Sequence, residues 1–295
     1  MTPTVLPSVP TPFAPYTLRL PEADAVPLIC DSPHSGVLYP DDFRYCLPFE
    51  KLRAGEDTDV HVLWEALPSV GATLLAAQFP RAYIDPNREL EDIDASMLAE
   101  PWPTPLTPSE KTRLGIGLIW RDAGQDGRKP IYDRLLSVAE VRKRIDNYHA
   151  PYHAAMQEQI ESAYSRSGAV WHLNLHSMPA NSYESLQIKS EHPLADFVLG
   201  DRDGTTAAPE FTDMVAQALR LRGFSVALND PFKGVALIAR LGRPAERRHS
   251  LQVELHRGLY MDENTRARST NFQALQNALA EVSRDIAAYV RSQVK

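Results

Sequence analysis

The chain has 295 residues, of which 43% are hydrophobic, and its 31 basic and 38 acidic side chains give a net charge of −7. This composition excludes a disordered chain, and the negative charge argues against a broad nucleic-acid surface. No apolar run is long enough to cross a bilayer, no secretory signal opens the chain, and two cysteines are too few for a disulfide framework. We therefore expect a cytoplasmic globular protein that binds neither membranes nor nucleic acids; the sequence does not indicate its oligomeric state.

The first half of the chain combines short apolar segments with loops. Residues 1–24 are expected to form an extended N-terminal arm. Apolar runs predict strands at residues 25–32, 72–78 and 81–85, and helical spacing of apolar residues predicts a helix over residues 57–67. Four prolines between residues 101 and 108 indicate an irregular excursion over residues 99–130, of the kind that serves as a lid or pocket wall.

The second half alternates strands and helices. A long helical stretch is predicted over residues 135–165, with a break near Pro151. The other predicted elements are strands at 169–175, 224–229 and 250–256, and helices at 209–222 and 270–293. This alternation is typical of an α/β sandwich with a largely parallel sheet. No segment has the composition of a linker, so residues 25–295 are expected to form a single domain.

Polar residues interrupt the ends of four apolar segments that we interpret as strands. They lie at residues 30–34, 84–88, 173–177 and 253–257. In open α/β sheets, ligands bind outside the carboxyl ends of the strands. The pattern therefore predicts a binding or catalytic site at this edge of the sheet.

Two histidines at these strand ends, His34 and His176, could each supply an imidazole to a metal. A catalytic zinc site typically uses three protein ligands and keeps a fourth position for water. The acidic cluster at residues 56–59 is the best candidate for the third ligand. The compact motif H-E-x-x-H is absent, so hydrogen-bonded structural histidines are the alternative interpretation.

Glu254 lies inside an apolar strand, where a carboxylate must be paired or protonated. It could form an ion pair with Arg257 or Arg240, or it could be a general base whose pKa is tuned by burial.

Two arginines, Arg81 and Arg88, lie near Asn87 in the segment around residues 84–88. They could bind a carboxylate through two parallel hydrogen bonds, because the guanidinium fork matches that group. The alternative is an exposed arginine that pairs with Glu89 or Glu91.

Eight short segments, in their order and spacing, resemble the N-formylglutamate amidohydrolases, also called N-formylglutamate deformylases. The resemblance extends from about residue 25 to residue 265. The segments are residues 33–36 (PHSG), 56–59 (EDTD), 84–88 (IDPNR), 175–177 (LHS), 199–204 (LGDRDG), 229–234 (NDPFKG), 242–244 (GRP) and 251–255 (LQVEL).

The resemblance implies a fold and a metal. The family is distantly similar to the zinc carboxypeptidases, which implies a three-layer α/β/α sandwich with a mixed, largely parallel sheet of the phosphorylase/hydrolase-like kind. It implies one zinc ion on His34, on His176 and on a carboxylate of the acidic cluster, for which we choose Asp57 over Glu56. Carboxypeptidases place the acidic ligand three residues after the first histidine, where this chain has Val37. The carboxylate must therefore come from a later segment.

The resemblance also implies an activity, the hydrolysis of N-formyl-L-glutamate to formate and L-glutamate in histidine degradation. It gives Glu254 the role of general base. Arg81 would assist the reaction, while Asn87, Arg88 and Arg240 would bind the small anionic substrate. The alternatives are a zinc hydrolase of another N-acyl amino acid or short peptide, and a non-catalytic binding protein with a degenerate site.

Overall fold

The structure, a computed structural model, describes residues 11–124 and 129–294. The chain separates into two compact units whose segments alternate along the sequence. Unit 1 comprises Met1–Thr17, His34–Glu56 and Ala77–Ala154, and unit 2 comprises Leu18–Pro33, Asp57–Ala76 and Ala155–Lys295. Residues 1–10 of the expected arm lie outside the described residues, and the rest of the arm includes the strand Tyr16–Arg19.

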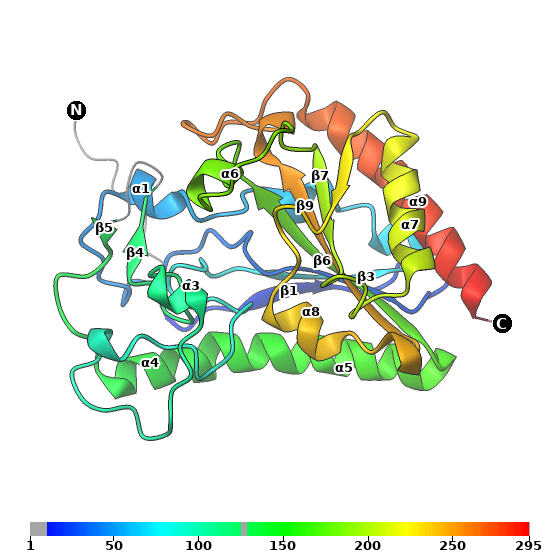
Figure 1. The fold of residues 1–295 in the computed structure, drawn as a ribbon. Coiled ribbons are helices and arrows are strands. Elements are labelled where there is room, and N and C mark those ends of the chain that lie inside the picture. The colour runs from blue at the N-terminus through cyan, green and yellow to red at the C-terminus, as the bar shows by residue number, and fades with distance from the viewer. Residues whose placement is uncertain (1–10, 125–128, 295) are drawn as a thin grey trace. The chain divides into compact units, whose positions relative to one another are not determined.

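The main sheet is mixed and largely parallel. Its strands are β1 (Tyr16–Arg19), β2 (Leu28–Ser32), β3 (Thr73–Ala77), β6 (Val170–Met178), β7 (Phe197–Gly200), β8 (Val226–Leu228) and β9 (Arg248–His256). They are arranged in the order β1-β3-β2-β6-β9-β7-β8, with β6 and β9 near the middle (Figure 1). The pairs β3–β2, β2–β6, β6–β9 and β7–β8 are parallel, whereas β7 runs antiparallel to β9.

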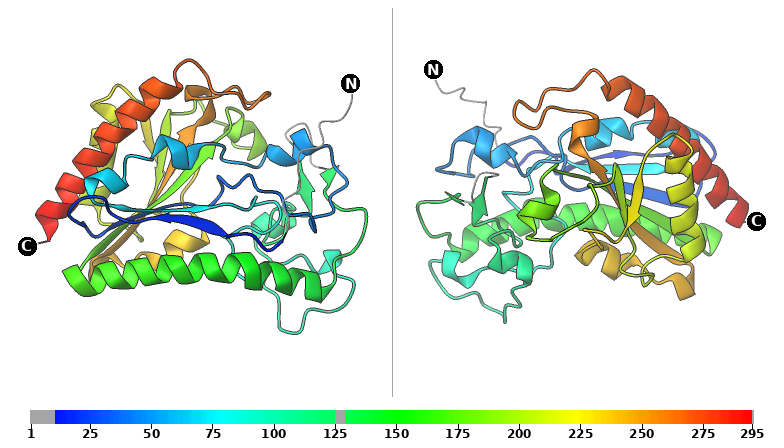
Figure 2. Two further views of the ribbon diagram at one scale, coloured as in Figure 1. Left: turned by 180° about the vertical axis from the view of Figure 1, so that it is seen from behind. Right: turned by 45° about the horizontal axis from the view of Figure 1, so that its top comes forward.

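Helices of unit 2 cover both faces of this sheet (Figure 2). One face packs against α2 (Val60–Leu63), α7 (Pro209–Arg220) and α9 (Phe272–Gln293) through one apolar core. The other face carries α8 (Ala236–Leu241) and the part of α5 (Ala150–Ser167) that belongs to unit 2. A further short helix, α6 (Ser182–Ser185), follows β6. This arrangement confirms the predicted three-layer α/β/α sandwich.

Unit 1 contains shorter elements and a buried arginine among aromatic rings. Its elements are α1 (Phe49–Arg53), α3 (Glu110–Arg113), α4 (Val138–Arg144) and the antiparallel pair β4 (Asp122–Ala123) and β5 (Lys129–Pro130). The Arg144 guanidinium lies over the ring of Tyr83, 4.1 Å from its centroid, and donates to the Tyr132 hydroxyl at 2.7 Å. These contacts offset part of the cost of burying a cation.

The predicted strand at residues 81–85 is wrong, because this segment is a tight turn. The Tyr83 amide donates to the Pro80 carbonyl at 3.0 Å. Pro80 and Pro86 flank the turn, and neither has the N–H group that a strand ladder requires. The polar residues that follow Ile84 therefore lie on a loop and not at the end of a strand.

The predicted break near Pro151 is also wrong. Between α4 and α5, residues Ile145–His149 form a π-helical turn, and the helical path continues through Pro151. A proline normally clashes with the carbonyl four residues before it, and a wider turn at that point relieves the clash.

Other elements differ from the predicted ones in their length or were not predicted. The helix expected over residues 57–67 is short, since α2 spans only Val60–Leu63 and a 3₁₀ turn follows at Pro68–Val70. Strand β7 and helix α8 had no predicted counterpart. The excursion over residues 99–130 contains only α3 and the short β4–β5 pair among its described residues.

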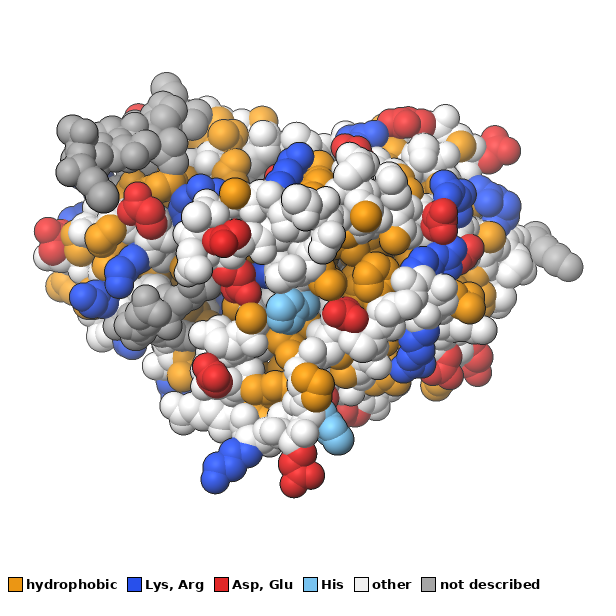
Figure 3. All heavy atoms as spheres, turned by 90° about the horizontal axis from the view of Figure 1, so that it is seen from above, with side chains coloured by type: hydrophobic (Ala, Val, Ile, Leu, Met, Phe, Trp, Pro, Cys, Tyr) orange, Lys and Arg blue, Asp and Glu red, His pale blue; other side chains and the backbone are white. Residues whose placement is uncertain are grey.

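The surface agrees with the charge composition. On the face seen in Figure 3, acidic and basic side chains are interspersed and no broad basic area is visible. Among the residues that the structure describes, no helix has the length and hydropathy needed to span a bilayer.

Candidate metal centre

Strands β6 and β9 place a row of polar side chains on one face of the sheet. Successive side chains of a strand point to opposite faces, and the two strands pair in register, His176 beside Glu254. The alternate residues, among them Leu175 and Val253, point into the apolar core shared with α7 and α9. The polar residues of the row, all buried, are His172, Asn174, His176, Ser250, Gln252 and Glu254.

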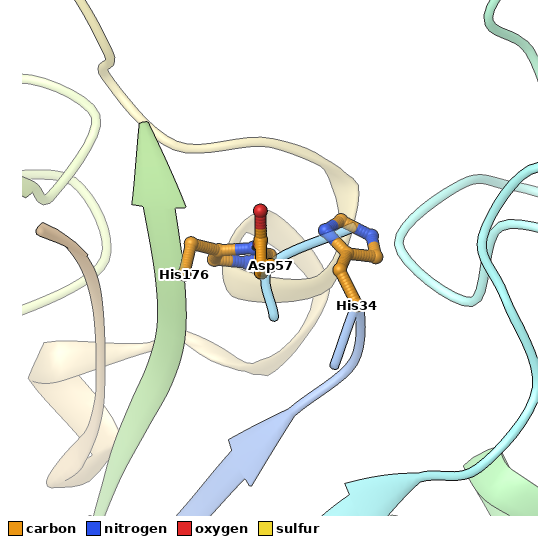
Figure 4. Close-up of side chains that lie close together, drawn as sticks. All are labelled: His34, Asp57 and His176. Atoms are coloured by element: carbon orange, nitrogen blue, oxygen red, sulfur yellow. Dashed lines mark hydrogen bonds and ion pairs between the residues drawn. The ribbon is translucent and has the colours of Figure 1, made fainter. Parts of the chain in front are cut away.

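Asp57 and His176 face each other at the carboxyl end of β6 (Figure 4). The Oδ2 atom of Asp57 lies 3.1 Å from Nδ1 of His176. Its other oxygen, Oδ1, accepts from Arg257 Nη2 at 3.0 Å and from the Ser177 hydroxyl at 3.2 Å. Arg257 and Ser177 therefore determine which oxygen of Asp57 faces the histidine.

The ion pair between Arg257 and Asp57 is buried. Burial opposes the positive charge of Arg257, but the Asp57 carboxylate outweighs it, and the pKa of Arg257 is raised. Arg257 is one of the two arginines that the sequence offered as a partner for Glu254. The structure pairs it with Asp57.

The loop that carries Asp57 is held by residues from much later in the chain. The Tyr260 hydroxyl donates to the Thr58 carbonyl at 2.8 Å, and Arg268 forms an ion pair with Asp59 at 2.7 Å. Asp59 itself has a left-handed backbone, with φ 61°, directly before α2. Asp59 tolerates this conformation better than most residue types would, which lets the chain turn sharply into the helix.

Glu254 is buried on β9, directly beside His176 on β6. Gln252 donates its side-chain amide to Oε1 of Glu254 at 2.9 Å, which orients the carboxylate. The register therefore places a carboxylate on the same sheet face as one candidate metal ligand.

In unit 1, His34 is hydrogen-bonded to Asp85. Its Nε2 lies 2.8 Å from Oδ1 of Asp85, and Arg81 donates to Oδ2 at 2.9 Å. Burial alone would raise the pKa of Asp85, but Arg81, His34 and Arg88 together hold this pKa well below its usual range. An ionised carboxylate can only accept, so Nε2 of His34 carries the ring proton and Nδ1 has the lone pair for a metal.

The other candidates of unit 1 surround the same aspartate. The Arg81 guanidinium stacks on the Trp120 ring at 4.9 Å. Arg88 is buried, which lowers its pKa, and it donates to the carbonyls of Asn87 and Ile116 at 2.8 and 3.1 Å. Residues 116–120 of the long excursion therefore support the loop that carries these arginines.

Glu56 and Arg240 are the remaining candidates that the sequence names. The carboxylate of Glu56 accepts from the Tyr39 hydroxyl at 2.7 Å and from Arg53 at 2.9 Å. Arg240 is exposed in the last turn of α8.

The sequence pattern indicates neither Arg257 as a partner of Asp57 nor Asp85 as a partner of His34. It also indicates no separate role for the remaining polar residues of the row, which are His172, Asn174, Ser250 and Gln252. The polar residues recur at every second position of these strands, for example in WHLNLHS and HSLQVELH, and that period is the signal that could have found them.

His34, Asp57 and His176 are buried side chains whose donor atoms could hold a metal ion. Two imidazoles and one carboxylate form a donor set that occurs in catalytic zinc sites. Two ligand atoms of one tetrahedral zinc lie about 3.3 Å apart. The 3.1 Å between Asp57 Oδ2 and His176 Nδ1 fits that value, so these residues fit a metal.

The mixed α/β sheet, with buried acidic and basic side chains gathered at the carboxyl ends of its central strands, is typical of an α/β hydrolytic enzyme. The model of the N-formylglutamate amidohydrolase family matches residues 26–261, and the chain belongs to this family. The resemblance found in the sequence is thereby confirmed.

Relatives of known name agree with this assignment. A crystal structure of N-formylglutamate amidohydrolase from Ralstonia eutropha JMP134 is 61% identical, with a TM-score of 0.93, and the match covers 96% of this chain and all of that chain. The N-formylglutamate deformylase of Pseudomonas putida is 27% identical over 242 residues, 81% of this chain and 83% of that protein. The gene product Atu2144 of Agrobacterium tumefaciens, at 17% identity and a TM-score of 0.59 over 95% of this chain and 96% of that one, shares the fold.

Proposed function

We propose that this chain is a metal-dependent amidohydrolase that cleaves the formyl amide of N-formyl-L-glutamate to give formate and L-glutamate. The observation that carries this proposal is the 61% identity, over 96% of the chain, with a protein named N-formylglutamate amidohydrolase. The arrangement of Asp57, His176 and Glu254 around the carboxyl end of β6 supports it, because it supplies candidate ligands and a base.

The proposed metal is one zinc ion held by His34, Asp57 and His176. When bound, zinc lowers the pKa of a bound water toward ~7 and polarises a carbonyl oxygen. The chain's own contribution is to present one lone pair from each ligand. Asp85 does this for His34 by accepting the proton of its Nε2, and Arg257 does it for Asp57 by occupying its Oδ1.

Glu254 is the proposed general base. It takes a proton from the attacking water and delivers it to the leaving amine. Its position beside His176 and its hydrogen bond from Gln252 suit this role, since a base must be held in one orientation near the reacting atoms.

Three arginines and Asn87 are the proposed partners of the substrate's two carboxylates and of the developing oxyanion. A dianionic substrate needs local positive charge in a protein whose net charge is −7. We assign Arg81 to the oxyanion and Asn87, Arg88 and Arg240 to the carboxylates.

A formate-release assay with and without a chelator, combined with metal analysis, tests this function. The wild-type protein should release formate from N-formylglutamate and lose this activity when the metal is removed. Release that ignores chelation would rule out the metal mechanism. A panel with N-acetylglutamate, N-formylaspartate and short peptides separates the proposed substrate from other N-acyl amino acids. A zinc-free protein with no hydrolytic activity would indicate a binding protein.

The Glu254→Gln variant tests the proposed base. We expect it to retain zinc and to lose about 10²–10⁴-fold in turnover, because general base catalysis contributes that much. The matched control is Glu191→Gln, which neutralises an exposed carboxylate and should leave turnover unchanged. Turnover of the Glu254 variant close to that of the wild type would contradict the assignment.

A further inference from the structure

Four buried polar residues near His176 have no part in the proposed mechanism. His172 and Asn174 lie on β6, Ser250 lies on β9, and Asp31 lies on the neighbouring strand β2. Asp31 and Asn174 are 0% exposed, Ser250 is 0% exposed, and His172 is 1% exposed. A buried polar side chain costs stability unless it is hydrogen-bonded. These four residues form one connected chain of hydrogen bonds within unit 2.

Asp31 is the branch point of this chain. Its Oδ1 lies 2.9 Å from Nε2 of His172 and 2.7 Å from the side-chain amide nitrogen of Asn174. A carboxylate oxygen accepts, so both nitrogens must donate to it. The Nδ1 atom of His172 then accepts from the Ser250 hydroxyl, 2.7 Å away. Every bond in the chain thus has a defined direction.

The hydrogen bond to Asp31 determines which way the side-chain amide of Asn174 is oriented. Because its NH₂ group faces Asp31, its Oδ1 faces Nε2 of His176, at 2.6 Å. An amide oxygen only accepts, so Nε2 of His176 must carry the proton. The remaining nitrogen, Nδ1, faces Asp57 Oδ2 at the longer distance of 3.1 Å.

Asp57 is the competing acceptor, because its Oδ2 can also only accept. The single proton of a neutral ring therefore serves either Nε2 and Asn174 at 2.6 Å or Nδ1 and Asp57 at 3.1 Å, and the shorter contact favours Nε2. Arg257 and Ser177 also draw on the Asp57 carboxylate, through its Oδ1. Without Asn174, however, a neutral His176 would gain most by placing its proton on Nδ1 and donating to Asp57. That tautomer would block the nitrogen that the metal needs.

We propose that Asp31 and Asn174 are positioning residues that fix the tautomer of His176, with its proton on Nε2, so that Nδ1 is the metal-binding nitrogen. His172 and Ser250 anchor Asp31 in this arrangement. The part of the inference that concerns metal binding rests on the proposed function, whereas the tautomer is a property of the metal-free protein.

The tautomer can be read directly from the nitrogen chemical shifts of ¹⁵N-histidine-labelled, metal-free protein at alkaline pH, where imidazoles are neutral. We expect the wild-type His176 signal to show the proton on Nε2. The Asn174→Leu variant should show it on Nδ1, since the acceptor of Nε2–H is gone and Asp57 remains. The same tautomer in both proteins, or a proton on Nδ1 in the wild type, would overturn the proposal.

Metal affinity provides a second readout, measured by competition between the protein and a chromophoric chelator for zinc. Loss of an outer hydrogen-bond partner typically weakens metal binding about 10–100-fold, and we expect this loss in Asn174→Leu. If the wild type binds no zinc, the proposed function fails, while the nitrogen shifts still decide the tautomer. If the wild type and Asn174→Leu bind zinc equally, the positioning role fails, while the proposed function stands.

A rescue variant covers the case in which Asn174→Leu does not fold. In the double variant Asp31→Asn with Asn174→Asp, the donor and the acceptor of the central bond are exchanged without a change of size. The new amide at position 31 then also donates to Nε2 of His172, whose proton moves to Nδ1 and is accepted by the Ser250 hydroxyl. A carboxylate at position 174 still accepts the Nε2 proton of His176, so we expect the Nε2–H tautomer and zinc affinity within a few-fold of the wild type. A single Asn174→Asp change places two carboxylates in contact and should bind zinc more weakly than the double variant. A double variant that is no better than the single one would contradict the proposal.

Discussion

Each carboxylate oxygen of Asp57 has its own partner, Arg257 and Ser177 at Oδ1 and His176 at Oδ2. The neighbouring Glu56 has the same functional group, but its carboxylate is hydrogen-bonded to Tyr39 and Arg53. At the scale of single residues, the partners of these two carboxylates distinguish a candidate ligand from a structural acid.

The comparison of Asp57→Asn with Glu56→Gln tests this distinction. The first change removes a proposed ligand and should weaken zinc binding by more than about 100-fold, since losing an outer partner alone costs 10–100-fold. The second should leave zinc affinity within about threefold. Chelator competition measures both. The reverse order of affinities would make Glu56 the ligand.

The two arginines that hold the loop of Asp57 should differ in their effect on stability. Arg257 is 4% exposed in its pair with Asp57, whereas Arg268 is 49% exposed in its pair with Asp59. Arg257→Met leaves a buried carboxylate without its cation and should cost about 3–5 kcal/mol of unfolding free energy. Arg268→Met should cost at most about 1 kcal/mol. Urea unfolding at pH 7 measures both, and equal losses would contradict the prediction.

At the scale of elements, α4 begins with a capping box. The Ser137 side chain accepts from the Glu140 amide at 3.1 Å, and the Glu140 carboxylate accepts from the Ser137 amide at 2.9 Å and from Arg134 at 2.7 Å. Burial would raise the pKa of Glu140, but Arg134 and the Ser137 amide outweigh it and lower the pKa to about 2. The ionised side chain therefore stabilises the start of the helix.

This lowered pKa has a defined consequence for stability. The contribution of Glu140 is complete above its unfolded-state value of 4.5 and is lost as the pH falls toward about 2. Glu140→Gln should cost about 0.5–1 kcal/mol at pH 7, because the pair is partly exposed and solvent screens it. The difference from the wild type should shrink at pH 3. Urea midpoints at both pH values measure it, and a difference that grows on acidification would refute the argument.

The periodicity of the sequence predicted most of the sheet and the long helices, because alternating and helical apolar patterns are local. It failed where a local pattern was ambiguous. Residues 81–85 are apolar enough for a strand, yet the prolines on either side make them a turn. Pro151 normally ends a helix, and only the π-helical turn before it allows the helix to continue.

At the scale of the whole molecule, the segments of the two units alternate along the chain, and α5 runs without interruption across the change at residue 154. Neither unit is one continuous stretch of sequence. We therefore propose that the chain folds as one domain after its N-terminal arm, as the sequence analysis expects.

Calorimetry tests this expectation. If the chain folds as one domain, unfolding of the metal-free protein should give a single transition in which the calorimetric and van't Hoff enthalpies agree. Two separate transitions, or a van't Hoff enthalpy well below the calorimetric value, would show that the two units unfold independently.

The sequence by itself determined the family, the class of fold and the residue types available for a metal and a base. Motifs and apolar periods depend only on residues that are close together in the chain. The tertiary structure alone decided the partners of those residues. Asp57 meets His176 across 119 positions and Arg257 across 200. The orientation of His176 depends on Asp31, which the pairing of β2 with β6 brings to Asn174. Such contacts follow from strand order and register, which no local pattern specifies.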